Sequence, residues 1–172
     1  VDSAEIRRAL KSLAPTKVAV AYLGSGWQTY IPDISCGLDI IVSPRLGTNA
    51  DVVQALMRTP RVRVYLLDDL HSKFYLGPSA ALLGSCNLSN NALGQGGLRE
   101  VAILTSRAVD RSVLEREFQR CLRAAKNAYP SRKAMMVRLE KLKQQTIRAR
   151  EAGLIRGNGR PSIDNSLGNF VG

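Results

Sequence analysis

The order of apolar runs along the chain constrains the fold more than any other feature. KVAVAYLG at 17–24, LDIIVS at 38–43 and RVRVYLL at 61–67 are short and rich in β-branched residues, which is typical of buried strands. NADVVQALMR, between the second and third runs, has helical spacing, and Thr48 or Asn49 can cap it. A strand, a helix and a strand in this order require a crossover, so the sequence predicts a partly parallel sheet.

The remaining segments extend this pattern on both sides. Residues 3–12 predict an opening helix, and HSKFYL and AALLGSCN, separated by residues 77–79, predict a hairpin. REVAILT at 99–105 predicts another strand, and Ser89 is placed to cap a short helical turn before it. From about Val109 the apolar spacing becomes helical, is interrupted at Pro130, and continues to about Arg150. We therefore predict an α/β fold with a mixed β-sheet flanked by helices, including helices at the C-terminal side.

The length and composition of the chain predict one main domain. We assign residues 1–151 to it, with 109–151 as a basic helical segment, and 152–172 to a tail or linker rich in Gly, Asn and Ser. The apolar runs are too short to span a bilayer, so we expect no stable membrane insertion. Nothing in the sequence reads as a leader, and three cysteines without metal-type spacing favour a reducing, cytoplasmic location.

The charge is unevenly distributed along the chain. The net charge is +11, and the stretch from Arg107 to Arg160 contains fifteen Lys and Arg against five Asp and Glu, so it carries +10 of this total. Such a balance indicates a polyanionic partner, with nucleic acid first and an acidic membrane surface second. The alternative is that these charges only keep two helix faces solvated.

The predicted hairpin carries the residues with the most distinctive chemistry. His71 is the only histidine of the chain, and Lys73 shares its strand face because side chains two residues apart point the same way. Ser85 and Asn87 share a face for the same reason. A turn centred on Ser79 would place His71 opposite Asn87 and Lys73 opposite Ser85. A shift of one residue in the register would break this arrangement.

These residue types suit chemistry on a phosphate group. Lys73, Asn87 and Ser85 can donate hydrogen bonds to phosphate oxygens without a metal ion or another cofactor. His71 can act as a nucleophile or as a proton carrier near neutral pH. Glu100, on the following predicted strand, can accept the imidazole N–H and fix its tautomer.

The same residues resemble a known family. HSK followed by GSCNLS, with a Glu in a later strand, is similar to the signature of the phospholipase D superfamily, an H-x-K motif followed by a Gly-Ser-x-Asn run. The resemblance covers roughly residues 71–100 and implies that residues 1–151 are a phospholipase D-like catalytic domain. Many members carry an Asp seven residues after the His, where this chain has Pro78. That difference argues against a typical lipid-cleaving member.

The resemblance also implies a mechanism. Members use two such motifs, whereas this chain has one, and it looks like the single-motif members: small bacterial endonucleases and metal-independent restriction enzymes, which form one site across a twofold axis. It implies a homodimeric endonuclease, with DNA favoured, in which one His71 forms a phosphohistidine and the second protonates the leaving group. Lys73 and Asn87 would hold the phosphate oxygens, Ser85 would support them, and Glu100 would orient His71.

Two other functions stay open. The first is hydrolysis of a phospholipid or another phosphodiester by the same chemistry, and the second is a catalytically silent nucleic-acid-binding module. The aromatic side chains of Trp27 and Tyr30, in a Gly-rich loop, could stack on bases, or they could simply close that loop over the core.

Overall fold

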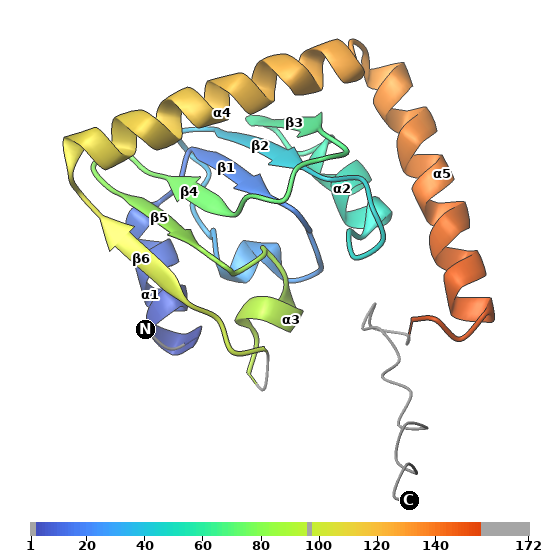
Figure 1. The fold of residues 1–172 in the computed structure, drawn as a ribbon, viewed down its shortest axis with the longest axis horizontal. Helices are drawn as coiled ribbons and strands as arrows, with labels where there is room; N and C mark the ends of the chain where they lie inside the picture. Colours follow the sequence, from blue (N-terminus) through green and yellow to red (C-terminus); the bar gives the residue numbers. More distant parts are fainter. Residues whose placement is uncertain (1–2, 96–97, 156–172) are drawn as a thin grey trace, which may run out of the picture.

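The computed structural model describes residues 3–95 and 98–155, which form a six-stranded sheet with helices on both faces (Figure 1). Residues 156–172, most of the expected tail, lie outside the described residues. The elements, in chain order, are α1 (Ser3–Leu13), β1 (Lys17–Val20), the 3-10 helix η1 (Trp27–Thr29), β2 (Leu38–Val42), α2 (Ala50–Leu56), β3 (Val62–Leu66), β4 (Phe74–Leu76), β5 (Ala81–Gly84), α3 (Asn90–Leu93), β6 (Ala102–Thr105), α4 (Ala108–Ala128) and α5 (Arg132–Glu151).

The sheet is mixed, as the sequence predicts. Its strand order is β3-β2-β1-β4-β5-β6, in which β1, β2 and β3 are parallel and the three later strands pair antiparallel. The helix α2 is the crossover between β2 and β3, and it begins where the side chain of Asn49 accepts hydrogen bonds from two backbone N–H groups. The prediction of an α/β fold with helices at the C-terminal side is confirmed.

Each face of the sheet has its own apolar core. The long helix α4 crosses one face, where Phe118 packs edge-on against Phe74 of β4 with ring centroids 6.5 Å apart. On the other face α1 and α2 pack over the sheet, and α5 extends the core by packing on α2 with Leu139 and Leu142 (Figure 1). Ser131 caps α5, so Pro130 marks the break between the two basic helices.

One edge of the sheet collects the polar residues singled out above. Because β1, β2, β3 and β5 end there while β4 and β6 begin there, five loop segments meet along it. We call it the His71 edge and define it by residues 21–25, 43–49, 67–73, 85–89 and 98–101. The helix α5 runs alongside this edge (Figure 1).

The register of the hairpin differs by one residue from the predicted one. Phe74 pairs with Leu83, and the backbone N–H of Gly84 donates to the carbonyl of Lys73, so Lys73 lies opposite Gly84 and not Ser85. The turn explains the shift, because Gly77 donates to the carbonyl of Ala80 and leaves a loop of two residues. His71 and Lys73 also precede β4 instead of lying within it.

The loop aromatics belong to the core. Trp27 and Tyr30 are buried, and the Tyr30 hydroxyl donates a hydrogen bond to Oδ1 of Asn90 at 2.7 Å. The alternative that they stack on bases is therefore wrong, and they close the loop over the core. Across residues 3–95 and 98–155, no helix combines the length and apolarity needed to cross a membrane.

Candidate active site at the His71 edge

His71 and Lys73 form the centre of the candidate site. The His71 side chain is exposed, and Nζ of Lys73 lies 3.3 Å from its Nε2 and 2.7 Å from its backbone carbonyl oxygen. A protonated lysine can only donate, so Nε2 accepts this hydrogen bond, and a neutral His71 then carries its proton on Nδ1. The nitrogen beside the ammonium group is therefore the one that carries the lone pair, which Lys73 occupies until it turns to another acceptor.

The ammonium group of Lys73 is partly withdrawn from water. Burial lowers the pKa of Lys73, and the negative charge of Glu100 counteracts this shift. A lysine in this position is a more acidic donor than one in free solution. It can transfer its hydrogen bond from His71 to a phosphate oxygen at little further cost in solvation.

Ser85 and Glu100 form a second pair beside the first. The Ser85 hydroxyl donates to Oε2 of Glu100 and accepts a hydrogen bond from the backbone N–H of Val101 at 3.0 Å. The sequence predicts that Glu100 binds the His71 imidazole, but in the structure its carboxylate accepts from Ser85. Glu100 acts on the centre through its charge, which is felt at Lys73.

Asn87 is fixed at the same edge by a backbone hydrogen bond from the segment just after β1. Its Oδ1 accepts a hydrogen bond from the backbone N–H of Tyr22 at 2.9 Å, so its amide NH₂ is the group that remains to donate. The pairing of Ala19 with Phe74, the last pair of the β1–β4 ladder, places the start of β4, three residues after His71, beside the end of β1. Asn87 and His71 are thus both tied to the end of β1, although the hairpin register does not pair them.

Cys86, between Ser85 and Asn87, points into the core. Its carbonyl accepts a hydrogen bond from the buried Tyr75 hydroxyl at 3.0 Å, and burial raises the pKa of its thiol to about 11, with Glu100 adding to the shift. The thiol stays protonated near neutral pH and takes no part in chemistry. This alternation orients the side chains of Ser85 and Asn87 away from the core.

The anchor of the segment that carries His71 was not predicted from the sequence. Oδ1 of Asp68 accepts hydrogen bonds from Nε and Nη2 of Arg138 at 3.0 and 2.8 Å, and Oδ2 accepts one from the Tyr129 hydroxyl. Asp68 thereby ties residues 67–73 to the junction of α4 and α5. Nothing local in the sequence indicates this, since the partners lie 61 and 70 residues away.

The arrangement brings a nucleophile and several donors together at an exposed edge. His71 offers the lone pair, Lys73 the positive charge, and Asn87 and Ser85 polar groups close by, which is a set suited to phosphoryl transfer. Among residues 3–95 and 98–155, no group of three or more His, Cys, Asp and Glu side chains is placed to hold a metal ion.

Comparison with known proteins supports the fold. No family model matches the chain, and no curated protein matches its sequence. The solved structure of NucT from Helicobacter pylori superposes with a TM-score of 0.57 at 20% identity, covering 70% of this chain and 91% of NucT. TrmBL2, an archaeal chromatin protein, gives a TM-score of 0.47 at 11% identity, and the match covers 72% of this chain and 49% of the TrmBL2 chain. The architecture of this chain is therefore shared with NucT.

Proposed function

We propose that this chain is a phosphodiesterase of the phospholipase D type, and specifically a metal-independent endonuclease. The observation that carries the proposal is the exposed His71 imidazole with its Nε2 next to Lys73, at an edge where Ser85, Asn87 and Glu100 also meet. The fold that this chain shares with NucT supports the proposal as a common scaffold. The fifteen Lys and Arg between Arg107 and Arg160 favour DNA or RNA as the substrate.

The reaction would proceed in two displacements. In the first, Nε2 of one His71 attacks phosphorus, a P–N bond forms, and the P–O bond to the leaving group breaks as a second His71 protonates the departing oxygen. In the second, that histidine takes a proton from water, the resulting hydroxide attacks phosphorus, and the P–N bond breaks. Lys73 would turn from Nε2 to a non-bridging oxygen when the phosphate binds, which frees the lone pair.

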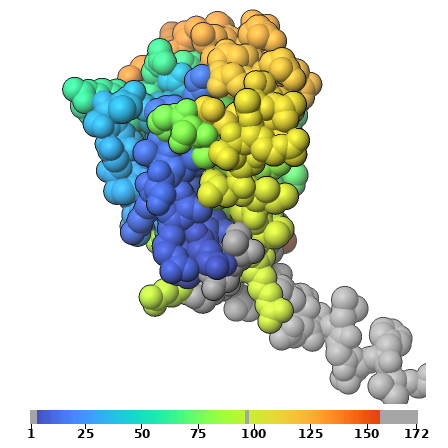
Figure 2. All heavy atoms as spheres, turned by 90° about the vertical axis from the view of Figure 1, so that its left-hand side faces the viewer, coloured from blue at the N-terminus to red at the C-terminus, as the bar shows by residue number. Residues whose placement is uncertain are grey.

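The second His71 would come from another copy of the chain, because the sequence contains one histidine. An apolar surface on β5, β6 and the preceding loop supports this dimer. It consists of side chains that are 43–66% exposed: Leu83, Leu98, Val101 and Ile103. Figure 2 shows β6 and the first turns of α4 beside α1 on this side of the molecule. Val101 hydrogen-bonds Ser85, so the apolar surface adjoins the candidate site, as a twofold interface through that site requires.

Cleavage of labelled DNA in EDTA tests the chemistry. We expect the wild type to cleave and His71→Ala to lose at least about a thousandfold in rate, since the nucleophile and the general acid are removed together. Ser72→Ala, a change at the exposed neighbouring position, is the matched control and should cleave like the wild type. Equal rates for wild type and His71→Ala would refute the proposal. Faster turnover of labelled phosphatidylcholine than of DNA would indicate that the substrate is a phospholipid.

Mixing experiments test the shared site. If one site needs two His71 side chains, His71→Ala subunits that exchange freely inactivate their partners. An equal mixture of the two proteins then has about one quarter of the activity of a sample with the same total protein that is all wild type, because only one dimer in four contains two His71 side chains. Independent sites would retain about one half. Ile103→Asp places a charge on the apolar surface. We expect light scattering to show that this variant is monomeric, and the DNA assay to show that it no longer cleaves.

A further inference from the structure

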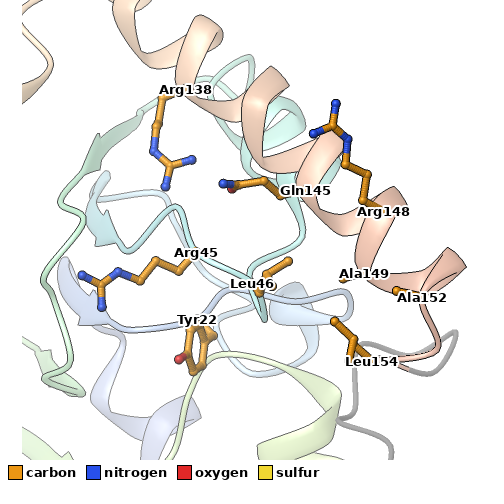
Figure 3. A pocket seen from close by; sticks show the side chains of 9 residues that line it. All are labelled: Tyr22, Arg45, Leu46, Arg138, Gln145, Arg148, Ala149, Ala152 and Leu154. Atoms are coloured by element: carbon orange, nitrogen blue, oxygen red, sulfur yellow. The ribbon is translucent and has the colours of Figure 1, made fainter.

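A cavity of about 710 Å³ lies between α5 and the His71 edge, and nothing in the proposed chemistry uses it (Figure 3). Arg138 and Arg148 project from α5 on one side, and Tyr22 and Arg45 come from the loops after β1 and β2 on the other (Figure 3). Leu154, just after α5, closes the lower end in this view. The cavity therefore brings together parts of the chain that are more than ninety residues apart.

The cavity is strongly positive. No Asp or Glu of the described residues lines it, whereas three arginines do. Arg45 and Arg148 are exposed and form no ion pair with any carboxylate of residues 3–95 and 98–155. Arg138 is paired with Asp68, but its Nη1 has no hydrogen-bond partner among the same residues. Two guanidinium groups are thus free to bind an anion.

The same cavity has an apolar and aromatic wall. Leu46 and Leu154 are 43% and 64% exposed, although leucine is usually buried. The Tyr22 ring is in close contact with Gly47, where an added Cβ would come within 3.0 Å of the ring. Guanidinium groups beside an aromatic ring and exposed leucines match a nucleotide, which presents a charged phosphate and a flat apolar base.

Tyr22 connects this cavity to the candidate active site. Its backbone N–H donates to Asn87 at the His71 edge, and the last β1–β4 pair, Ala19 with Phe74, lies three residues from Tyr22 along β1 and three residues from His71 before β4. A strand with one phosphate at His71 would therefore extend along this edge toward Tyr22. The cavity lies on the path that the substrate would follow along this edge.

We propose that this cavity is a nucleotide subsite for a single-stranded stretch of nucleic acid. One base stacks against Tyr22 between the leucine side chains, and the adjoining phosphates bind Arg45 and Arg148. The inference rests on the proposed function, because it assigns the strand next to the phosphate that His71 attacks. The cavity is open to solvent on one side, so an unpaired base can lie flat on Tyr22, whereas the faces of a base within a duplex are already covered by its neighbours; the cavity therefore favours unpaired strands.

Binding measured without cleavage tests the subsite. The probe is a fluorescein-labelled oligothymidine of about 20 nucleotides, titrated by anisotropy at several KCl concentrations in the His71→Ala background. In that background we expect R45Q/R148Q to weaken binding at least about fivefold and to reduce the log–log salt slope by about 1.4, since two phosphate contacts are lost. Tyr22→Leu should weaken binding about fivefold or more with an unchanged slope, since only stacking is lost.

The control is R8Q/R58Q, which removes the same charge from exposed positions outside both the cavity and the Arg107–Arg160 segment. We expect it to change the affinity less than about twofold at moderate salt, because distant exposed charges are screened. Equal affinities of R45Q/R148Q and this control would overturn the subsite. So would an unchanged affinity in Tyr22→Leu. A duplex of the same length that binds as tightly as the single strand would overturn the selection of unpaired strands.

The outcome can be separated from that of the proposed function. If wild type cleaves DNA and His71→Ala does not, but the cavity variants bind normally, only the subsite fails. If the cavity variants lose binding while wild type shows no cleavage, the proposed reaction fails and the cavity stands as a binding site alone. Vesicles of phosphatidylcholine and phosphatidylglycerol are the second probe, and arginine-dependent binding to them without such binding to oligothymidine would also overturn the nucleotide assignment.

Discussion

The ion pair between Asp68 and Arg138 offers the sharpest test of how the candidate site is held. Asp68 lies three residues before His71, and its carboxylate binds Arg138 through two nitrogens and the Tyr129 hydroxyl through a third contact. The perturbation is Asp68→Asn, which keeps the shape and one acceptor oxygen but removes the charge. It leaves the Arg138 guanidinium, whose side chain is only 17% exposed, without a counter-charge.

The expected cost lies between two limits. Exposed ion pairs contribute at most about 1 kcal/mol, whereas breaking a buried pair costs about 3–5 kcal/mol. The Asp68 side chain is 42% exposed and the Arg138 side chain 17%, so the full buried figure does not apply. We therefore expect a loss of about 2 kcal/mol in the free energy of unfolding. This value agrees with the typical net contribution of a hydrogen bond to a charged group. For a chain of this length it corresponds to a fall of roughly 4–8 °C in Tm.

Urea unfolding followed by circular dichroism measures this loss directly. Asp69→Asn is the matched control, because Asp69 is exposed and makes no side-chain hydrogen bond within the described residues. It should change the unfolding free energy by less than about 0.5 kcal/mol. A cycle with Arg138→Met should give a coupling energy above about 0.5 kcal/mol, since the two side chains are in contact. If Asp68→Asn unfolds like Asp69→Asn, or if the coupling is absent, the anchor assigned to the His71 segment is wrong.

Further expectations follow from burial and charge elsewhere in the chain. A thiol reagent should label Cys36 alone in the native protein, because it is exposed while Cys86 and Cys121 are buried with thiol pKa values near 11; fast labelling of a second thiol would contradict that. Burial raises the pKa of Glu115, but hydrogen bonds from Lys17 and Gln119 and nearby positive charges outweigh this and lower it overall. Glu115→Gln should therefore lower the free energy of unfolding by less than about 1 kcal/mol at pH 7. The difference in stability between wild type and variant should vanish below about pH 4, where the Glu115 carboxylate becomes protonated in the folded wild type. A difference that stays unchanged in acid would refute this expectation.

Local signals in the sequence were enough to predict the order of the elements. The N-cap side chains of Asn49 and Ser89 act within three residues of where they stand, and the structure shows both caps. Alternating or continuous apolar runs likewise predict strands because burial depends on short-range spacing. The strand, helix and strand order then limits the topology to a crossover, and so the mixed sheet was predictable without any long-range information.

The details of the site depend on contacts that local spacing does not specify. A two-residue turn at 78–79 sets the hairpin register, and a change of one residue in turn length moves Ser85 away from Lys73 and toward Glu100. The contact between Tyr22 and Asn87 spans 65 residues and exists because β1 and β5 end at the same edge. The polar residues at this edge were predictable from the sequence, but their hydrogen-bond partners follow from the assembled sheet.

The position of Pro78 shows why its departure from the family pattern matters little. Pro78 lies in the turn after β4, at the opposite end of that strand from His71. Seven residues of extended chain span about 23 Å, so a side chain at position 78 cannot touch a phosphate bound at His71. In this chain the carbonyl of Pro78 instead accepts a hydrogen bond from Arg111 of α4 at 2.6 Å, which secures the turn. The position therefore affects how the hairpin is held, and it does not distinguish a lipid substrate from a nucleic acid. That distinction depends on the side chains along the His71 edge, where the proposed subsite places a nucleotide against Tyr22 and Arg45.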